Sequence, residues 1–127
     1  MNKEKVRALI HSYIRAYNAF DIDGMMELLH PGIEFKNYSV GKVNAEAYGL
    51  AEFRALAEQA KQLFSSRTQT LTDLRFEKDK AIAEIDYHGV LAVDLPNGLK
   101  AGEEIQLTGR SEFQFKEGKI SMITDYS

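Results

Sequence analysis

The chain has 127 residues and a formal charge of −3, and its 44% apolar and 28% charged residues are typical of a single globular domain over residues 1–127. Its Lys and Arg residues are scattered, which excludes a basic surface for nucleic acid, and no apolar run approaches the length of a membrane span. The absence of cysteine excludes disulfides and thiolate chemistry. We therefore expect a cytoplasmic protein with no nucleic-acid or membrane partner. Because the three histidines are not spaced as metal ligands, we expect no metal or cofactor.

The first third of the chain predicts two helices followed by a short strand. Over residues 3–19, apolar side chains recur every three or four positions, the period of one helix face. Asp21 is a suitable N-cap for a second, short helix, and Pro31 ends that helix because it lacks an N–H. Phe35 and Asn37 then alternate onto one side of a strand, so that an amide continues an apolar face. We interpret Asn37 as pointing into a pocket.

The remainder of the chain predicts one more helix and then antiparallel hairpins. A loop at residues 38–44 precedes a helix at residues 45–64. Alternating stretches separated by turn residues predict further strands at residues 67–77, 80–95, 103–116 and 119–126. Three N-terminal helices packed on one face of a strongly curved, mostly antiparallel sheet make an α+β domain. Such a cone encloses a cavity wherever the helices do not fill it.

The string YNAFDIDGMMELLHPGIEF resembles the helix–helix–strand opening of the nuclear transport factor 2-like superfamily, and the element order is similar along the whole chain. This superfamily includes SnoaL-like polyketide cyclases, ketosteroid isomerases and limonene-1,2-epoxide hydrolases. The resemblance implies the cone-shaped, cystatin-like fold with a ligand pocket inside it. It does not imply one activity, because this fold carries many unrelated functions.

Two shorter strings, FKN and GKISMITDYS, are similar to parts of the limonene-1,2-epoxide hydrolases. By this resemblance Asn37 and Asp125 hold and activate a water molecule, and Asp86 contributes from a middle strand. Two positions depart from that family, because Phe35 stands in place of its Tyr and Glu84 in place of its Arg. We therefore predict acid–base chemistry by Asp125, Asn37 and Asp86, but not epoxide hydrolysis specifically.

The comparison with ketosteroid isomerases yields one match and one departure. Tyr13 corresponds to the helix Tyr that donates to an enolate oxygen in that family. Asn37, however, stands where the general-base Asp belongs, and an amide cannot abstract a proton. The mechanism of that family is therefore not expected.

Each polar candidate also has a purely structural interpretation. Asn37 would then be a turn amide that ends a strand, and Asp125 an exposed residue on an edge strand. Asp86 alternates with Ile85 and Tyr87, so the binary pattern places it in solvent, whereas the resemblance places it in the pocket. The sequence leaves both interpretations open.

Aromatic side chains are the expected walls of the pocket. Tyr13 and Tyr17 lie on the apolar stripe of the first helix, where core packing is the other interpretation. A buried hydroxyl needs a polar partner, which a pocket supplies. The predicted substrate-binding residues are Tyr13, Tyr17, Phe20, Phe35, Phe53, Phe64 and Phe113.

Two functions remain open on the sequence. One is a cofactor-independent enzyme, of isomerase, hydrolase or cyclase type, that acts on a small apolar molecule. The other is a non-catalytic ligand-binding or dimerisation module on the same fold. A protein-transport factor ranks third, because nothing marks a docking surface. We also expect a homodimer through the sheet, since its exposed face would carry Val90 and Ala92 and such dimers are usual in the resembling families.

Overall fold

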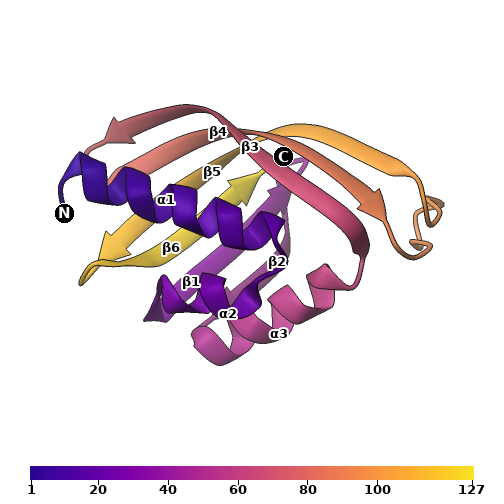
Figure 1. Ribbon diagram of the computed structural model, residues 1–127, viewed down its shortest axis with the longest axis horizontal. Coiled ribbons are helices and arrows are strands. Elements are labelled where there is room, and N and C mark those ends of the chain that lie inside the picture. The colour runs from indigo at the N-terminus through magenta and orange to yellow at the C-terminus, as the bar shows by residue number, and fades with distance from the viewer.

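The fold combines three helices with one six-stranded sheet, in a computed structural model that describes residues 1–127 (Figure 1). The chain begins with the helices α1 (Lys3–Asn18) and α2 (Ile22–Glu27). It continues with β1 (Leu29–Ser39), β2 (Lys42–Tyr48), α3 (Leu50–Lys61), β3 (Phe64–Glu77), β4 (Lys80–Leu91), β5 (Glu104–Lys116) and β6 (Lys119–Tyr126). The expected α+β class and the curved sheet are confirmed.

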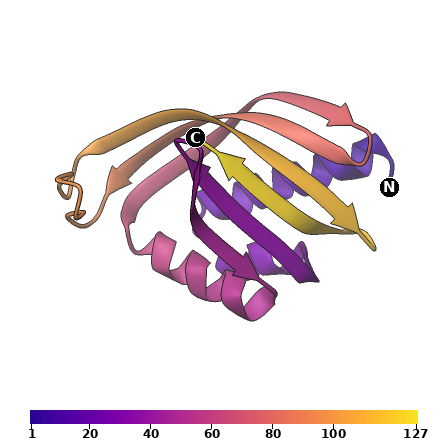
Figure 2. The ribbon, with the colours of Figure 1, turned by 180° about the vertical axis from the view of Figure 1, so that it is seen from behind.

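The strands follow the order β2-β1-β6-β5-β4-β3 across the sheet. Neighbouring strands are antiparallel except β1 and β6, which run parallel. Figures 1 and 2 show the sheet curving over the helices, which lie on its concave side. The parallel pairing joins β1, the first strand, to β6, the last. Residues that are far apart in the sequence therefore lie side by side in the sheet.

The helices cover the concave side in two places. α1 packs against β3, α3 packs against β1 and β2, and α2 contacts both other helices. The buried side chains of α1 recur at helical spacing and are Val6, Ile10, Tyr13 and Ile14. They join the main core with sheet residues that include Ile33, Phe113, Ile120 and Ile123. None of the three helices combines the length and apolarity needed to cross a membrane.

The predicted turns and caps are largely confirmed. Asp21 caps α2, and its Oδ1 accepts a hydrogen bond from the backbone N–H of Gly24 at 2.9 Å. Residues 78–79 and 117–118 join adjacent antiparallel strands, as expected.

The segment after β1 differs from the prediction. Residues 42–48 form β2, which pairs along β1, instead of a loop and the start of a helix. α3 begins only at Leu50, after Gly49 with a φ of 86°. Two of the three helices therefore precede the sheet, and the third follows its first hairpin.

Several predicted ends are also displaced: α3 stops at Lys61 instead of residue 64, and β3 begins at Phe64 instead of residue 67. α2 ends at Glu27, and Pro31 lies inside β1, where the pairing with β6 is interrupted between Leu29 and Glu34. A residue without an N–H fits such an interruption. At the other end of the sheet, β4 stops at Leu91, so residues 92–95 belong to the connection to β5.

Candidate functional site

A cavity of about 870 Å³ lies between the concave side of the sheet and the helices α1 and α3. Five of the seven predicted aromatic residues line it, namely Tyr13, Tyr17, Phe35, Phe53 and Phe64. The rings of Phe35 and Phe53 meet edge to face, with centroids 5.7 Å apart. The volume and the aromatic wall suit a small molecule with an apolar body.

Three polar residues lie side by side across neighbouring strands at the wall of this cavity. Asn37 on β1 pairs with Asp125 on β6, and Asp125 pairs in turn with Ser111 on β5. The hydroxyl of Ser111 donates to Oδ1 of Asp125 at 2.6 Å. The amide of Asn37 donates to Oδ1 of Asn44, also at 2.6 Å. Asn37 and Asp125 therefore both line the cavity, as the sequence predicted for their positions.

Burial changes the acidity of the groups in this row. It raises the pKa of Asp125 from its ordinary 3.8 to about 6, although the hydrogen bond from Ser111 lowers that pKa in part. Burial also raises the pKa of Tyr13 well above its ordinary value, and the negative charge of Asp125 raises it further. The carboxyl group can therefore exchange a proton near neutral pH, while the Tyr13 hydroxyl stays a neutral donor.

A second set of polar residues also lies in the cavity wall. The hydroxyls of Tyr17 on α1 and Tyr87 on β4 are 3.1 Å apart and share a hydrogen bond. Beside them, Arg67 on β3 donates from Nε to the backbone oxygen of Tyr17 at 3.1 Å. All three residues line the cavity. The wall thus carries the carboxyl group of Asp125 and the guanidinium groups of Arg67 and Arg110, together with neutral phenols.

Asp86 does not belong to the site, and its predicted place in the pocket is wrong. It is exposed on β4, opposite Thr70 and Thr108, and does not line the cavity. Its neighbours Ile85 and Tyr87 line the cavity instead, so the period-two alternation predicted the side of Asp86 correctly and the resemblance to the limonene-1,2-epoxide hydrolases did not.

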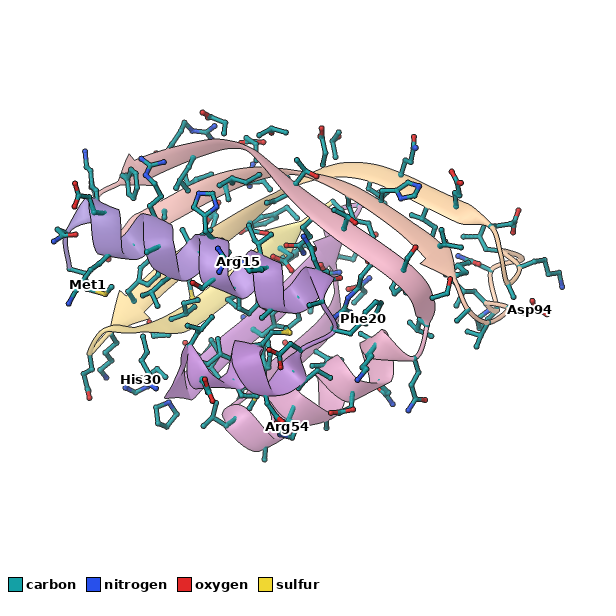
Figure 3. All side chains as sticks on the ribbon, viewed as in Figure 1. Met1, Arg15, Phe20, His30, Arg54 and Asp94 are labelled. Carbon is teal, nitrogen blue, oxygen red and sulfur yellow. The ribbon has the colours of Figure 1, made fainter.

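Two predicted aromatic residues also lie outside the cavity wall. Phe113 is 2% exposed and packs edge to face on Tyr13 in the core, with centroids 6.2 Å apart. Phe20 lies at the end of α1 (Figure 3), where its ring centroid is 4.5 Å from Cζ of Arg67. Their predicted role as cavity walls is therefore wrong.

The predicted site omitted Arg67, Tyr87 and Ser111. The parity of the strand places Arg67 on the same side as Gln69, and both line the cavity. The alternation alone did not identify which face of the strand is buried, because the surrounding residues SSRTQT are polar on both faces. No three His, Asp or Glu side chains are grouped so as to hold a metal ion.

The family model of the SnoaL-like domain matches residues 10–123, most of the chain. The chain belongs to this family. The SnoaL-like domain is part of the nuclear transport factor 2-like superfamily, which the opening string had indicated. No curated protein sequence matches the chain.

Solved structures share the fold of this SnoaL-like domain. A candidate polyketide cyclase from Xanthomonas campestris pv. campestris is 23% identical, with a TM-score of 0.79 over 100% of this chain and 93% of that one. Another from Pseudomonas putida KT2440 is 25% identical, with a TM-score of 0.73 over 94% and 88% of the two chains. An uncharacterised cystatin-fold protein from Novosphingobium aromaticivorans is 18% identical, with a TM-score of 0.75 over 93% and 94%.

Proposed function

We propose that this SnoaL-like domain is an enzyme that binds a small, largely apolar molecule in the cavity and moves a proton on it with Asp125. The observation that carries the proposal is a half-buried carboxyl group in the cavity wall, with its pKa raised to about 6. A group that titrates near neutral pH is suited to general acid–base catalysis. Such a carboxyl group is mainly ionised at pH 7 and acts first as a base.

The residues around Asp125 support proton abstraction next to a carbonyl group. Asp125 would take a proton from the α-carbon, and the electron pair of that C–H bond would move to the carbonyl oxygen to form an enolate. Tyr13 lines the same cavity with a neutral hydroxyl that could donate to this oxygen. Ser111 would hold the carboxylate in place through its 2.6 Å hydrogen bond.

In a substrate with a C=C bond conjugated to the enolate, the dienolate would take back the proton from Asp125 at its γ-carbon. In a substrate with a second carbonyl group, the enolate carbon would instead attack that carbonyl carbon, and the alkoxide so formed would take the proton from Asp125. The first outcome is an isomerisation and the second is a cyclisation. Two of the similar structures are candidate polyketide cyclases, which supports the second outcome. The isomerisation needs proton transfer alone, and the cyclisation needs proton transfer and one new C–C bond without a change in overall oxidation state, so the proposal includes no cofactor.

Ligand binding without catalysis is the second candidate function. Asn37 bonds to Asn44 and Asp125 bonds to Ser111, so protein groups already hold both side chains in place without a substrate. A pocket of this kind could hold a ligand and leave it unchanged.

Deuterium exchange of an enolisable ketone separates the two functions. The probe is 2-tetralone in D₂O, with incorporation at the α-carbon followed by NMR. We expect the protein to accelerate exchange, with a rate that rises with pH around a midpoint near 6. Asp125→Asn should lower the rate by about 10²- to 10⁴-fold, because the amide cannot accept the proton.

Asp86→Asn is the matched control, because Asp86 is exposed outside the cavity and the substitution is the same. It should exchange the ketone as fast as the wild type. Unchanged exchange in Asp125→Asn would contradict the catalytic proposal. If the protein binds the ketone but does not accelerate its exchange, the result favours ligand binding without catalysis. If the protein neither binds the ketone nor accelerates its exchange, the result contradicts both candidate functions.

A further inference from the structure

Arg67 is a buried cation with no anionic partner. Its residue surface is 4% exposed, and it lines the cavity from β3. No carboxylate of the chain lies within ion-pair distance of it. A guanidinium group does not lose its proton in a protein, so this site keeps a full positive charge. Burial of an unpaired charge is costly, which makes a compensating group necessary.

Aromatic rings supply part of that compensation. Cζ of Arg67 lies 3.7 Å from the ring centroid of Tyr17 and 4.5 Å from that of Phe20. Ring faces attract cations through their quadrupole. Phe20 has a φ of 57°, a backbone conformation that is uncommon for such a residue. The fold thus holds a strained residue where its ring contacts the guanidinium group.

Asp125, the carboxyl group in the cavity wall, does not neutralise Arg67. None of the ion pairs in the chain joins the two side chains, and the carboxyl group accepts a hydrogen bond from Ser111 instead. Burial raises the pKa of both Tyr13 and Tyr17, the negative charge of Asp125 raises it further, and the positive charge of Arg67 lowers it in part. The ring of Tyr17 therefore contacts the guanidinium group, and no carboxyl group pairs with it.

We propose that the ligand of the cavity carries a planar oxyanion, a carboxylate or an ionised phenol, that binds Arg67. The proposal rests on the proposed function, in that the cavity must take a small molecule. Nε of Arg67 is bonded to the backbone of α1, and no carboxylate competes for the remaining N–H groups. A planar guanidinium fork fits a planar oxyanion, while the aromatic wall contacts the apolar body. The ligand would thus be oriented by its anionic end.

Matched probes test this proposal by calorimetry at pH 7.5. The probes are 2-naphthoate and 2-naphthamide, which share one apolar body and differ in charge. The wild type should bind the carboxylate about tenfold or more tightly than the amide, as expected for a charge-assisted bond in a buried site. Arg67→Gln should lose this preference and bind both probes with similar affinity.

Arg110→Gln is the matched control. Arg110 also lines the cavity, but its side chain is 43% exposed and already pairs with Glu112 at 3.2 Å. This variant should keep the preference for the carboxylate. Equal binding of the two probes by the wild type, or a preference lost in Arg110→Gln and kept in Arg67→Gln, would overturn the proposal.

A further measurement on the wild type covers the case in which Arg67→Gln does not fold. The Nε–H resonance of Arg67, assigned through the backbone, should shift with 2-naphthoate and stay in place with 2-naphthamide. No shift with the carboxylate would overturn the proposal. If only the amide binds, the oxyanion proposal fails while ligand binding by the cavity stands. If neither probe binds, the oxyanion proposal and the proposal that the cavity binds a small molecule of this kind both fail.

Discussion

The protonation state of Asp125 affects both the stability of the folded protein and the proposed reaction. Its carboxyl group lies half-buried in the cavity wall and accepts a hydrogen bond from Ser111. Because its pKa is about 6 in the folded protein and about 3.8 when unfolded, the folded state keeps a proton that the unfolded state has released. The free energy of unfolding therefore falls as the pH rises through this window and is constant above it. The ionised form, which the reaction needs, is the less stable one.

Replacement of Asp125 by Asn should stabilise the protein at neutral pH. The amide has no charge to bury and can still accept the hydrogen bond from Ser111. We expect Asp125→Asn to raise the free energy of unfolding at pH 7.5 by about 1–2 kcal/mol, with the shift discounted for partial exposure. At pH 4 the gain should be largely gone, because the wild-type carboxyl group is then protonated. Urea unfolding at both pH values measures this, and an equal gain at both would contradict it.

Removal of the Ser111 hydroxyl should raise the pKa of Asp125 above about 6, because the hydrogen bond from Ser111 lowers it. In Ser111→Ala only the stabilisation of the ionised form is lost, while burial remains. The ¹³C shift of the Asp125 carboxyl group, followed by NMR against pH, reports the midpoint directly. An unchanged or lower midpoint would show that the hydrogen bond from Ser111 does not stabilise the ionised carboxylate of Asp125.

At the scale of elements, Asn18 joins the end of α1 to the edge strand β3. Its Nδ2 donates to the backbone oxygen of Gln69 at 3.0 Å, and the N–H of Gln69 donates to its Oδ1 at 2.8 Å. The side chain thus pairs with an edge strand as a neighbouring strand would. This contact holds Tyr17 of α1 close to Arg67 of β3, where the proposed oxyanion binds.

Substitution of Asn18 by Asp should break one of these two hydrogen bonds. The carboxylate can still accept from the N–H of Gln69, but it cannot donate to the carbonyl oxygen. We expect a loss of about 1–3 kcal/mol in the free energy of unfolding at pH 7.5, because a partly buried acceptor loses its donor. Thermal and urea unfolding measure the loss.

Asn97→Asp is the matched control for this substitution. Asn97 lies exposed in the connection between β4 and β5, and its Oδ1 only accepts, from the N–H of Leu99 at 3.1 Å. The carboxylate preserves that bond, so stability should change by less than about 0.5 kcal/mol. Equal losses in the two variants would show that the Asn18 contact has no special role.

At the scale of the whole molecule, the homodimer through the sheet stays a prediction. The convex side of the sheet is more polar than the sequence suggested. Glu84 and Val90 are half-buried, Asp86 and Thr108 are exposed, and Ala92 lies beyond the end of β4. A dimer on this side would therefore use a mixed polar surface, like many interfaces that are not obligate.

Light scattering on the chain at micromolar concentration tests the dimer. We expect a mass of twice 14.4 kDa for the wild type. Thr108→Lys should give the monomer mass, because a lysine on the exposed side of β5 would have to lose its hydration in the interface. A monomer in the wild type, or a dimer in both, would contradict a sheet-mediated dimer.

Local patterns in the sequence were sufficient for the type and order of most elements. The 3.6-residue periodicity of α1, the Asp21 cap and the alternation of β4 each depend on neighbours within a few residues. For the same reason, the alternation placed Asp86 correctly when the more distant resemblance did not. β2 was missed although Val43, Ala45 and Ala47 alternate with polar residues, because Ala and Glu favour helices and have a low strand propensity. Only its pairing with β1 identifies it as a strand.

The sequence by itself determined the fold class, the aromatic character of the cavity and the positions of Asn37 and Asp125 on strands. Only the tertiary structure decided which groups meet there, because the hydrogen bond between Ser111 and Asp125 joins different strands. It also decided that Arg67, which lies in a polar stretch, is buried among aromatic rings. Periodicity reports which side of a strand a residue takes. Burial and charge pairing depend instead on what the rest of the chain places against that side.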